Sequence, residues 1–143
     1  ACLTERRIPG GSPLIELAAT DGGGFPRNGL VQKLLPFYRL GYLSLKEIVE
    51  KCSVNPAETF GLHQKGNLGI GADADITVLD MKRLDAAMSF AGGKRIMDHG
   101  RVTGSGGTFL TTKAGVKTAQ EMQLNYQIAD TQRSALYGER TAK

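Results

Sequence analysis

The stretch Leu43-Ser-Leu-Lys-Glu-Ile-Val-Glu-Lys-Cys-Ser-Val-Asn-Pro-Ala-Glu-Thr-Phe-Gly-Leu62 carries most of the information about the fold. Ser44 and Glu47 have the spacing of a capping box, in which each side chain satisfies a free N–H group at a helix start. Apolar residues then recur at helical spacing, at Leu45, Ile48, Val49 and Cys52. The Asn-Pro pair before Ala57 should break this helix, and the proline fits the first turn of a second short one. The stretch therefore predicts two consecutive helices.

Upstream of these helices lies a short apolar run, residues 14–20, which ends at Asp21 and a series of glycines. A short apolar run bounded by turn residues is typical of a buried strand in a parallel sheet, with a short helix as the alternative. Between this run and Leu43, apolar residues recur on one helical face over residues 30–40. They predict a helix that Pro36 should kink or divide, because proline removes a backbone hydrogen bond.

Downstream of the helices the sequence becomes rich in glycine and then in strand-forming residues. Residues 76–80 are β-branched and alternate in polarity, which predicts a strand. Further strand-like pieces follow at residues 95–97, 101–103 and 108–111. Asp98-His99-Gly100 lies between the first two of these pieces and fits a hairpin turn. From residue 114 onward helix-forming residues return, and we expect a helical tail whose apolar face packs on another surface, such as another subunit.

Length and composition fit a soluble, loop-rich domain. The 143 residues suffice for one core but not for a complete eightfold βα barrel, which needs about 200 or more. The net charge of +4 is modest, and its basic pairs are scattered rather than gathered in a patch, so we expect no nucleic-acid partner. No apolar run approaches the ~20 residues that cross a bilayer, so we expect no membrane partner. The first residues lack the apolar core of a secretory signal, which favours a cytoplasmic location.

Two patterns in the sequence invite a metal-site interpretation, and neither supports it. Cys2 and Cys52 are far apart and belong to no Cys-x-x-Cys motif, so we expect neither a zinc site nor a disulfide scaffold. Asp73 and Asp75 flank a small residue, as in a calcium loop, but the further oxygen ligands and the closing glutamate of such a loop are missing. We expect both aspartates to bond turn N–H groups where the chain enters the following strand.

The helices over residues 43–62 are followed by Lys65-Gly-Asn-Leu-Gly-Ile-Gly-Ala-Asp-Ala-Asp-Ile76. This order resembles the C-terminal part of the amidohydrolase superfamily, especially its dihydroorotase, hydantoinase and D-aminoacylase branches, over residues 14–80. The resemblance implies an α/β fold in three parts. Residues 1–62 would be the last βα segment of a metal-dependent-hydrolase TIM barrel, residues 63–112 the C-terminal part of a small β-sandwich, and residues 113–143 the helical tail.

The resemblance also assigns roles to two residues of the glycine-rich loop. Asp21 matches the aspartate that ends the eighth barrel strand of the family and faces the metal-bound water. It would be catalytic, and it would touch the metal only if a partner supplied the other ligands. The alternative is an aspartate that bonds the N–H groups of a glycine turn. Arg27, in the same loop, could pair with a substrate carboxylate, or it could be an exposed arginine without such a role.

Most of the family's metal ligands have no counterpart in this sequence. The family binds its metals through a His-x-His pair, further histidines and often a lysine, whereas only His63 and His99 occur here, at positions that match no ligand. The resemblance therefore implies a divalent metal, zinc, in a complete enzyme that hydrolyses amide or cyclic-amide C–N bonds, with no metal and no activity expected for this chain alone. Three interpretations remain open: a fragment of a longer enzyme, a subunit completed by a partner with the N-terminal barrel portion, or a non-catalytic module that binds a partner or a second copy of itself.

Overall fold

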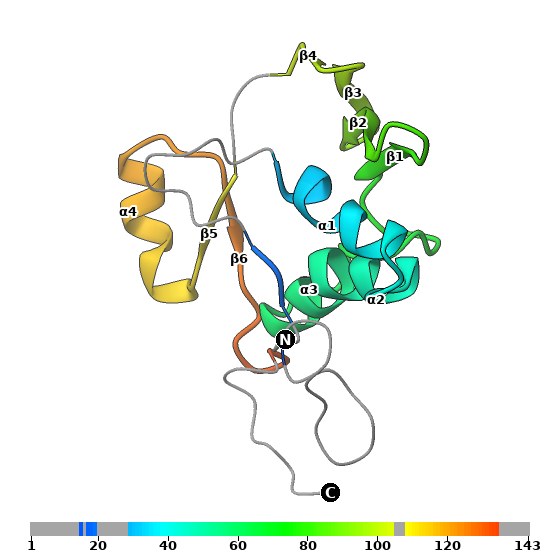
Figure 1. The fold of residues 1–143 in the computed structure, drawn as a ribbon. Coiled ribbons are helices and arrows are strands. Elements are labelled where there is room, and N and C mark those ends of the chain that lie inside the picture. Colours follow the sequence, from blue (N-terminus) through cyan, green and yellow to red (C-terminus); the bar gives the residue numbers. More distant parts are fainter. Residues whose placement is uncertain (1–14, 16, 20–28, 105–107, 135–143) are drawn as a thin grey trace, which may run out of the picture.

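The computed structural model describes residues 15, 17–19, 29–104 and 108–134 (Figure 1). Its order of helices and strands makes it a mixed α/β chain. The elements are α1 (Leu30–Arg39), α2 (Leu45–Val49), the π-helix η1 (Glu50–Val54), α3 (Asn55–Thr59), β1 (Ile76–Asp80), β2 (Asp85–Ala91), β3 (Lys94–Asp98), β4 (Arg101–Val102), β5 (Phe109–Thr111), the 3₁₀ turn η2 (Lys113–Gly115), α4 (Val116–Glu121) and β6 (Tyr126–Ile128). No helix among the described residues is long and apolar enough to cross a membrane.

Helix α1 supplies two of the four buried residues of the core cluster. Leu34 and Leu35 pack with Leu43 and Ile48, and apolar side chains from the end of β1 and the turn after it complete the cluster. Pro36 was expected to kink or divide this helix. It lies inside α1, which continues past it to Arg39 and is therefore not divided. Since the two buried leucines immediately precede the proline, their packing holds this part of the helix in place despite the lost backbone hydrogen bond.

The second helical stretch runs without a break from α2 through η1 into α3. The capping box at its start is confirmed, because Ser44 Oγ accepts a hydrogen bond from Glu47 N–H and the Glu47 carboxylate accepts one from Ser44 N–H. The expected break at the Asn-Pro pair is wrong. The chain widens into the π-helix just before Pro56, and Pro56 then lies in the first turn of α3, where its missing N–H costs little.

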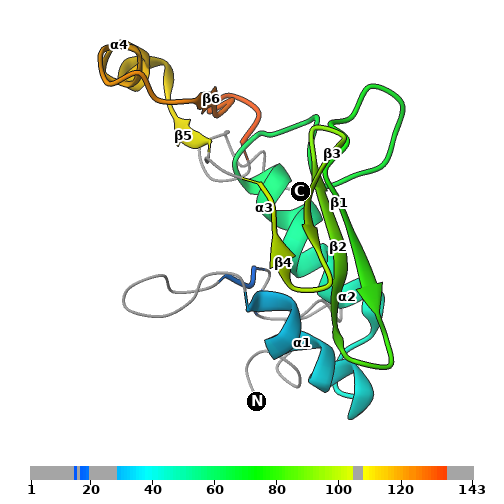
Figure 2. The same cartoon turned by 90° about the horizontal axis from the view of Figure 1, so that it is seen from above.

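Four strands form an antiparallel sheet in the order β1-β2-β3-β4. The strand predicted at residues 76–80 is β1, and the predicted hairpin joins β3 to β4 with Met97 opposite Val102. His99 and Gly100 both have positive φ, which suits a tight two-residue hairpin turn. Strand β2 was not predicted. Seen from above in Figure 2, the helices α1 to α3 lie along one side of this sheet.

The C-terminal part of the chain is not the purely helical tail that its composition predicts. Strands β5 and β6 pair in parallel, and the short helix α4 lies between them in the chain. The pairing with β5 gives β6 the backbone hydrogen bonds that a helix would otherwise supply. Beyond β6 the chain returns to the second helical stretch at the end of α3, where Ser134 is buried and donates a hydrogen bond from its Oγ to the carbonyl of Thr59.

Candidate functional site

The glycine-rich loop between α3 and β1 is closed by a cluster of three charged side chains. Lys65 Nζ lies 2.8 Å from Asp73 Oδ2 and 2.5 Å from Asp75 Oδ2. The other oxygen of Asp75 accepts a hydrogen bond of 2.8 Å from Gly92 N–H, at the turn between β2 and β3. These contacts tie the loop to the sheet. Both aspartates pair with a lysine and so stabilise the loop. The predicted bond to a turn N–H is made by Asp75, whereas the side chain of Asp73 contacts Lys65.

The same contacts shift two pKa values. The hydrogen bonds from Lys65 and then from Gly92 N–H lower the pKa of Asp75 below its ordinary value of 3.8. Hydrogen bonds to Asp73 and then to Asp75 raise the pKa of Lys65, against a smaller opposing effect of burial. Both pKa shifts widen the pH range over which Lys65 and Asp75 are charged.

The loop also lies very close to the π-helix. Gly66 has a φ of +75°, and a Cβ built there would lie 2.6 Å from the Ser53 carbonyl oxygen. A side chain at this position would therefore strain the backbone and collide with η1. Gly71 has a similar φ of +87° but open space around it. The loop thus contributes shape and close packing rather than reactive groups.

We expect the loop cluster to make the chain acid-sensitive. Because the folded-state pKa of Asp75 is lowered, its carboxylate stabilises the fold above its ordinary pKa of 3.8, and this contribution is lost as the pH falls through the folded-state value. Asp75→Asn should lower the free energy of unfolding at pH 7 by about 0.2–1 kcal/mol, the range for partly exposed ion pairs. Urea titrations between pH 7 and pH ~2 should show the wild-type and variant curves converging below the ordinary pKa.

Glu121→Gln is the matched control, because it also removes one negative charge but only from a surface pair 3.9 Å from Lys117. It should change the free energy of unfolding at pH 7 by less than Asp75→Asn. If the free energies of unfolding of the wild type and Asp75→Asn differed by the same amount at every pH, the charge of Asp75 would not contribute to stability.

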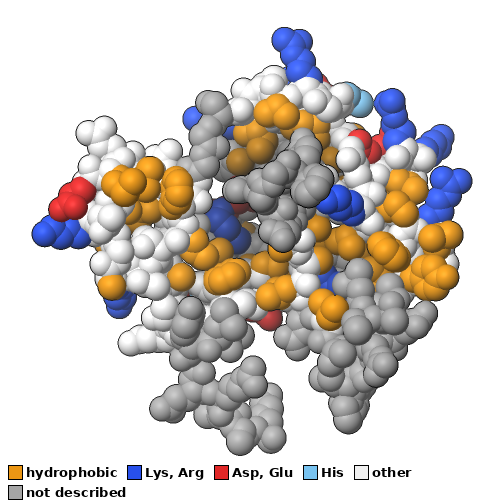
Figure 3. All heavy atoms as spheres, turned by 60° about the vertical axis from the view of Figure 1, so that its left-hand side comes forward, with side chains coloured by type: hydrophobic (Ala, Val, Ile, Leu, Met, Phe, Trp, Pro, Cys, Tyr) orange, Lys and Arg blue, Asp and Glu red, His pale blue; other side chains and the backbone are white. Residues whose placement is uncertain are grey.

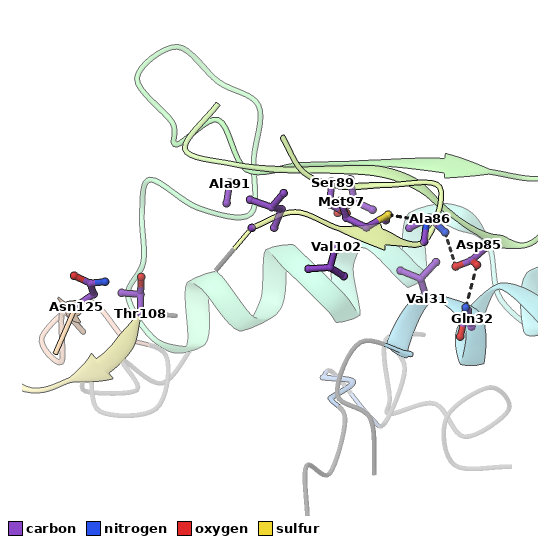
Figure 4. Close-up of a pocket in the computed structure, with 14 residues that line it drawn as sticks. Val31, Gln32, Asp85, Ala86, Ser89, Ala91, Met97, Val102, Thr108 and Asn125 are labelled. Carbon is purple, nitrogen blue, oxygen red and sulfur yellow. Dashed lines mark hydrogen bonds between the residues drawn. The ribbon is translucent and has the colours of Figure 1, made fainter. Parts of the chain in front are cut away.

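A cavity of about 750 Å³ lies between α1 and the four-stranded sheet (Figure 4). Val31 and Gln32 reach it from the helix, and Ser89 and Met97 from the sheet. Asp85 is the charged residue in its lining, and both of its oxygens are engaged, one by Gln32 Nε2 at 3.0 Å and one by Ala86 N–H at 2.7 Å. The cavity therefore offers a largely apolar binding surface and no activated nucleophile.

A second cavity of about 400 Å³ borders the loop cluster and includes Cys52 in its lining. Burial raises the pKa of the Cys52 thiol, and the nearby Lys51 lowers it by a smaller amount. A thiol with a raised pKa is a poor nucleophile near neutral pH. Cys52 is half-buried and packs against the core cluster, as its place in the apolar helical pattern predicts.

The residues singled out for catalysis, Asp21 and Arg27, lie outside the described residues. Of the residues that lead toward Asp21, Ile15 and residues 17–19 are described, and none of them has a strand assignment.

The two histidines are paired separately: His63 Nε2 lies 3.8 Å from Asp130, and His99 Nδ1 lies 2.5 Å from Asp98. The described part of the chain contains no group of three or more His, Cys, Asp and Glu residues placed to bind a metal, so these residues do not by themselves fit a catalytic zinc site.

Lys51 is 1% exposed, and its burial was not predicted from the sequence. Its Nζ donates a hydrogen bond to the carbonyl of Ile15, and its own carbonyl accepts one of 3.1 Å from Ala18 N–H. Lys51 follows Ile48 by three residues and so lies on the same, buried face of the helical stretch. This spacing is the feature of the sequence from which the burial of Lys51 could have been predicted.

Comparison with known proteins identifies a matching family and relatives of this chain. The model of the amidohydrolase family matches residues 19–107. Dihydroorotase of Pyrococcus furiosus is 45% identical over 53 residues, covering 37% of this chain and 13% of the relative. Dihydroorotase of Archaeoglobus fulgidus is 36% identical over 75 residues, covering 50% of this chain and 18% of the relative. The chain thus spans less than a fifth of the length of these relatives.

A solved structure, the formyltransferase/hydrolase complex of Methylorubrum extorquens with methylofuran, aligns with 80% of this chain and 25% of its own. The TM-score is 0.41 and the sequence identity 20%, so this likeness adds nothing to the assignment. The family model, in contrast, covers more than half of the chain, from the segment before Asp21 through the four-stranded sheet. On that match, the chain belongs to the amidohydrolase family.

Proposed function

We propose that this chain is the C-terminal portion of a metal-dependent amidohydrolase that hydrolyses amide or cyclic-amide C–N bonds, and that it is inactive on its own. The observation that carries the proposal is the family match over residues 19–107, which includes Asp21, the closing helices and the sheet. The dihydroorotases among its relatives favour the cyclic-amide branch. In this proposal, the helices close a TIM barrel and the four-stranded sheet is the C-terminal part of a small β-sandwich.

Asp21 is the proposed catalytic base. Hydrolysis of a C–N bond requires a water molecule to lose a proton as its oxygen bonds to the carbonyl carbon, and a carboxylate close to that water can accept the proton. The same proton can then pass to the departing nitrogen when the C–N bond breaks. Arg27, in the same loop, would orient the substrate by pairing with its carboxylate.

The other parts of the site would come from outside this chain. The divalent metal of the complete enzyme, zinc in our proposal, would be held by residues of the N-terminal barrel portion, with Asp21 as an additional ligand. Large apolar side chains exposed on the chain support completion by such a partner, because extended apolar surface is typical of an interface. Those that border the second cavity are Val49, Phe60, Leu68 and Ile76. Apolar side chains are also exposed on the face shown in Figure 3.

Native mass spectrometry of the protein purified from its own source tests this proposal. We expect a species larger than the 15.3 kDa of this chain, either a longer polypeptide that contains it or a complex with a second chain, carrying one or two zinc ions that a chelator removes. A metal-free species at the mass of this chain, or at a small multiple of it, would overturn the catalytic role. Such a species would indicate a self-associating module instead.

A further inference from the structure

Lys51 lies in an unusual environment for a lysine. It is among the most deeply buried side chains described, at 1% exposure, and it lies in the π-helix η1. Burying an amino group is costly unless it is hydrogen-bonded, and the Lys51 Nζ donates to the carbonyl of Ile15. The side chain therefore bonds to the backbone of the segment that leads to Asp21.

The backbone carbonyl of Lys51 bonds to the same segment, for a reason that can be read from the helix geometry. In η1 the bonds connect residues five apart, so Asn55 N–H donates to the Glu50 carbonyl. The next donor in this pattern would be residue 56, but it is a proline and has no N–H. The Lys51 carbonyl is thus available to a donor from outside the helix, and Ala18 N–H occupies it at 3.1 Å.

We propose that Lys51 is a positioning residue: it holds the segment of Ile15 and Ala18 at two points and so restrains the backbone that leads to Asp21. This inference rests on the proposed function of Asp21. Ala18 also packs against the apolar core, and Asp21 follows it by three residues. A catalytic base must lie within hydrogen-bond reach of its water. A displacement of ~1 Å caused by a distant change can cost about 100-fold in rate.

The structural part of this proposal is tested by amide hydrogen exchange, followed by NMR on the full chain. In the wild type, Ala18 N–H should be protected although its segment has no strand assignment. Lys51→Met keeps the length of the side chain but removes the donor, so Ala18 should exchange about tenfold faster while the core amide of Leu35 is unchanged. Lys51→Arg, which restores a donor, should recover most of the protection.

Lys46→Met is the matched control, because Lys46 lies in the same helical stretch with an exposed side chain and pairs with Glu50 only at 3.6 Å. It should leave the exchange of Ala18 unchanged. Unaltered exchange of Ala18 in Lys51→Met would overturn the proposal. If that variant does not fold, the wild type still decides the question, since an unprotected Ala18 N–H would rule out the two-point attachment.

The functional part is tested in the complete hydrolase. Lys51→Met should lower kcat about 10- to 100-fold with little change in KM, and Lys51→Arg should restore it in part. In an Asp21→Asn background, Lys51→Met should cause no further loss, because both changes would act on the same carboxylate. If Lys51→Met kept the wild-type kcat while Asp21→Asn was inactive, the positioning role of Lys51 would be overturned and the proposed function would stand. An active Asp21→Asn would instead refute the proposed function, and the exchange of Ala18 would remain valid evidence for the attachment.

Discussion

Asp21→Asn is expected to lower kcat of the complete hydrolase by about 10²–10⁴-fold, the range for loss of a positioned general base. Asparagine has nearly the same shape as aspartate but cannot accept a proton from the attacking water. Since proton transfer occurs on the way to the transition state, KM should change little and the loss should fall on kcat. Steady-state kinetics on an amide or cyclic-amide substrate, with the assembly identified by native mass spectrometry, measures both constants.

Glu58→Gln provides the control for Asp21→Asn. It also exchanges a carboxylate for an amide, but Glu58 is exposed in α3 and lies 37 positions along the chain from Asp21. Its kcat should equal that of the wild type. Activity that survives in Asp21→Asn, at the same zinc content and mass as the wild-type assembly, would remove Asp21 from the catalytic site.

Leu35→Ala is expected to lower the free energy of unfolding by about 2–5 kcal/mol, the range for truncating a buried leucine. Leu35 is 0% exposed and belongs to the core cluster that α1 forms with Leu43 and Ile48. Removing its side chain leaves a cavity that the surrounding helices cannot close. Because the total stability of a small domain is about 5–15 kcal/mol, the variant should lose a large part of it. Urea unfolding followed by circular dichroism measures the change.

The neighbouring Leu40→Ala is its matched control, since this side chain is 68% exposed at the end of the same helix. Its free energy of unfolding should lie within about 0.5 kcal/mol of the wild type. If the two variants were equally stable, the α1–α2 contact would not be the core of the chain.

The parts of the fold that the sequence predicted are those with strong local signals. The capping box at Ser44, the β-branched strand β1 and the turn at His99-Gly100 are each determined by residues within a few positions of one another. Strand β2 has no such signal. Its Ala86 and Ala87 are poor strand formers, and β2 is a strand because β1 and β3 pair with it on both sides.

The features of the candidate site that were not predicted also lack a local sequence signal. The chemistry of Asp21 and Arg27 was proposed from family resemblance, which local patterns cannot replace, and it stays a proposal. The burial of Lys51 depends on contact with Ile15 and Ala18, more than 30 positions upstream, and on a π-helix that the sequence did not reveal. A proline was expected to end the helix, whereas it leaves one carbonyl available to another part of the chain.

The attachment of the chain's last described residues to α3 has a consequence for synthesis on the ribosome. The partners Thr59 and Ser134 are 75 residues apart. At about 5–20 residues per second, several seconds of translation separate the appearance of one from that of the other. During that interval the helices and the meander of β1 to β4 can already form, because their contacts are local. The end of α3 meanwhile lacks its C-terminal partner, so the Thr59 carbonyl can bond only to water until the last described residues have been made.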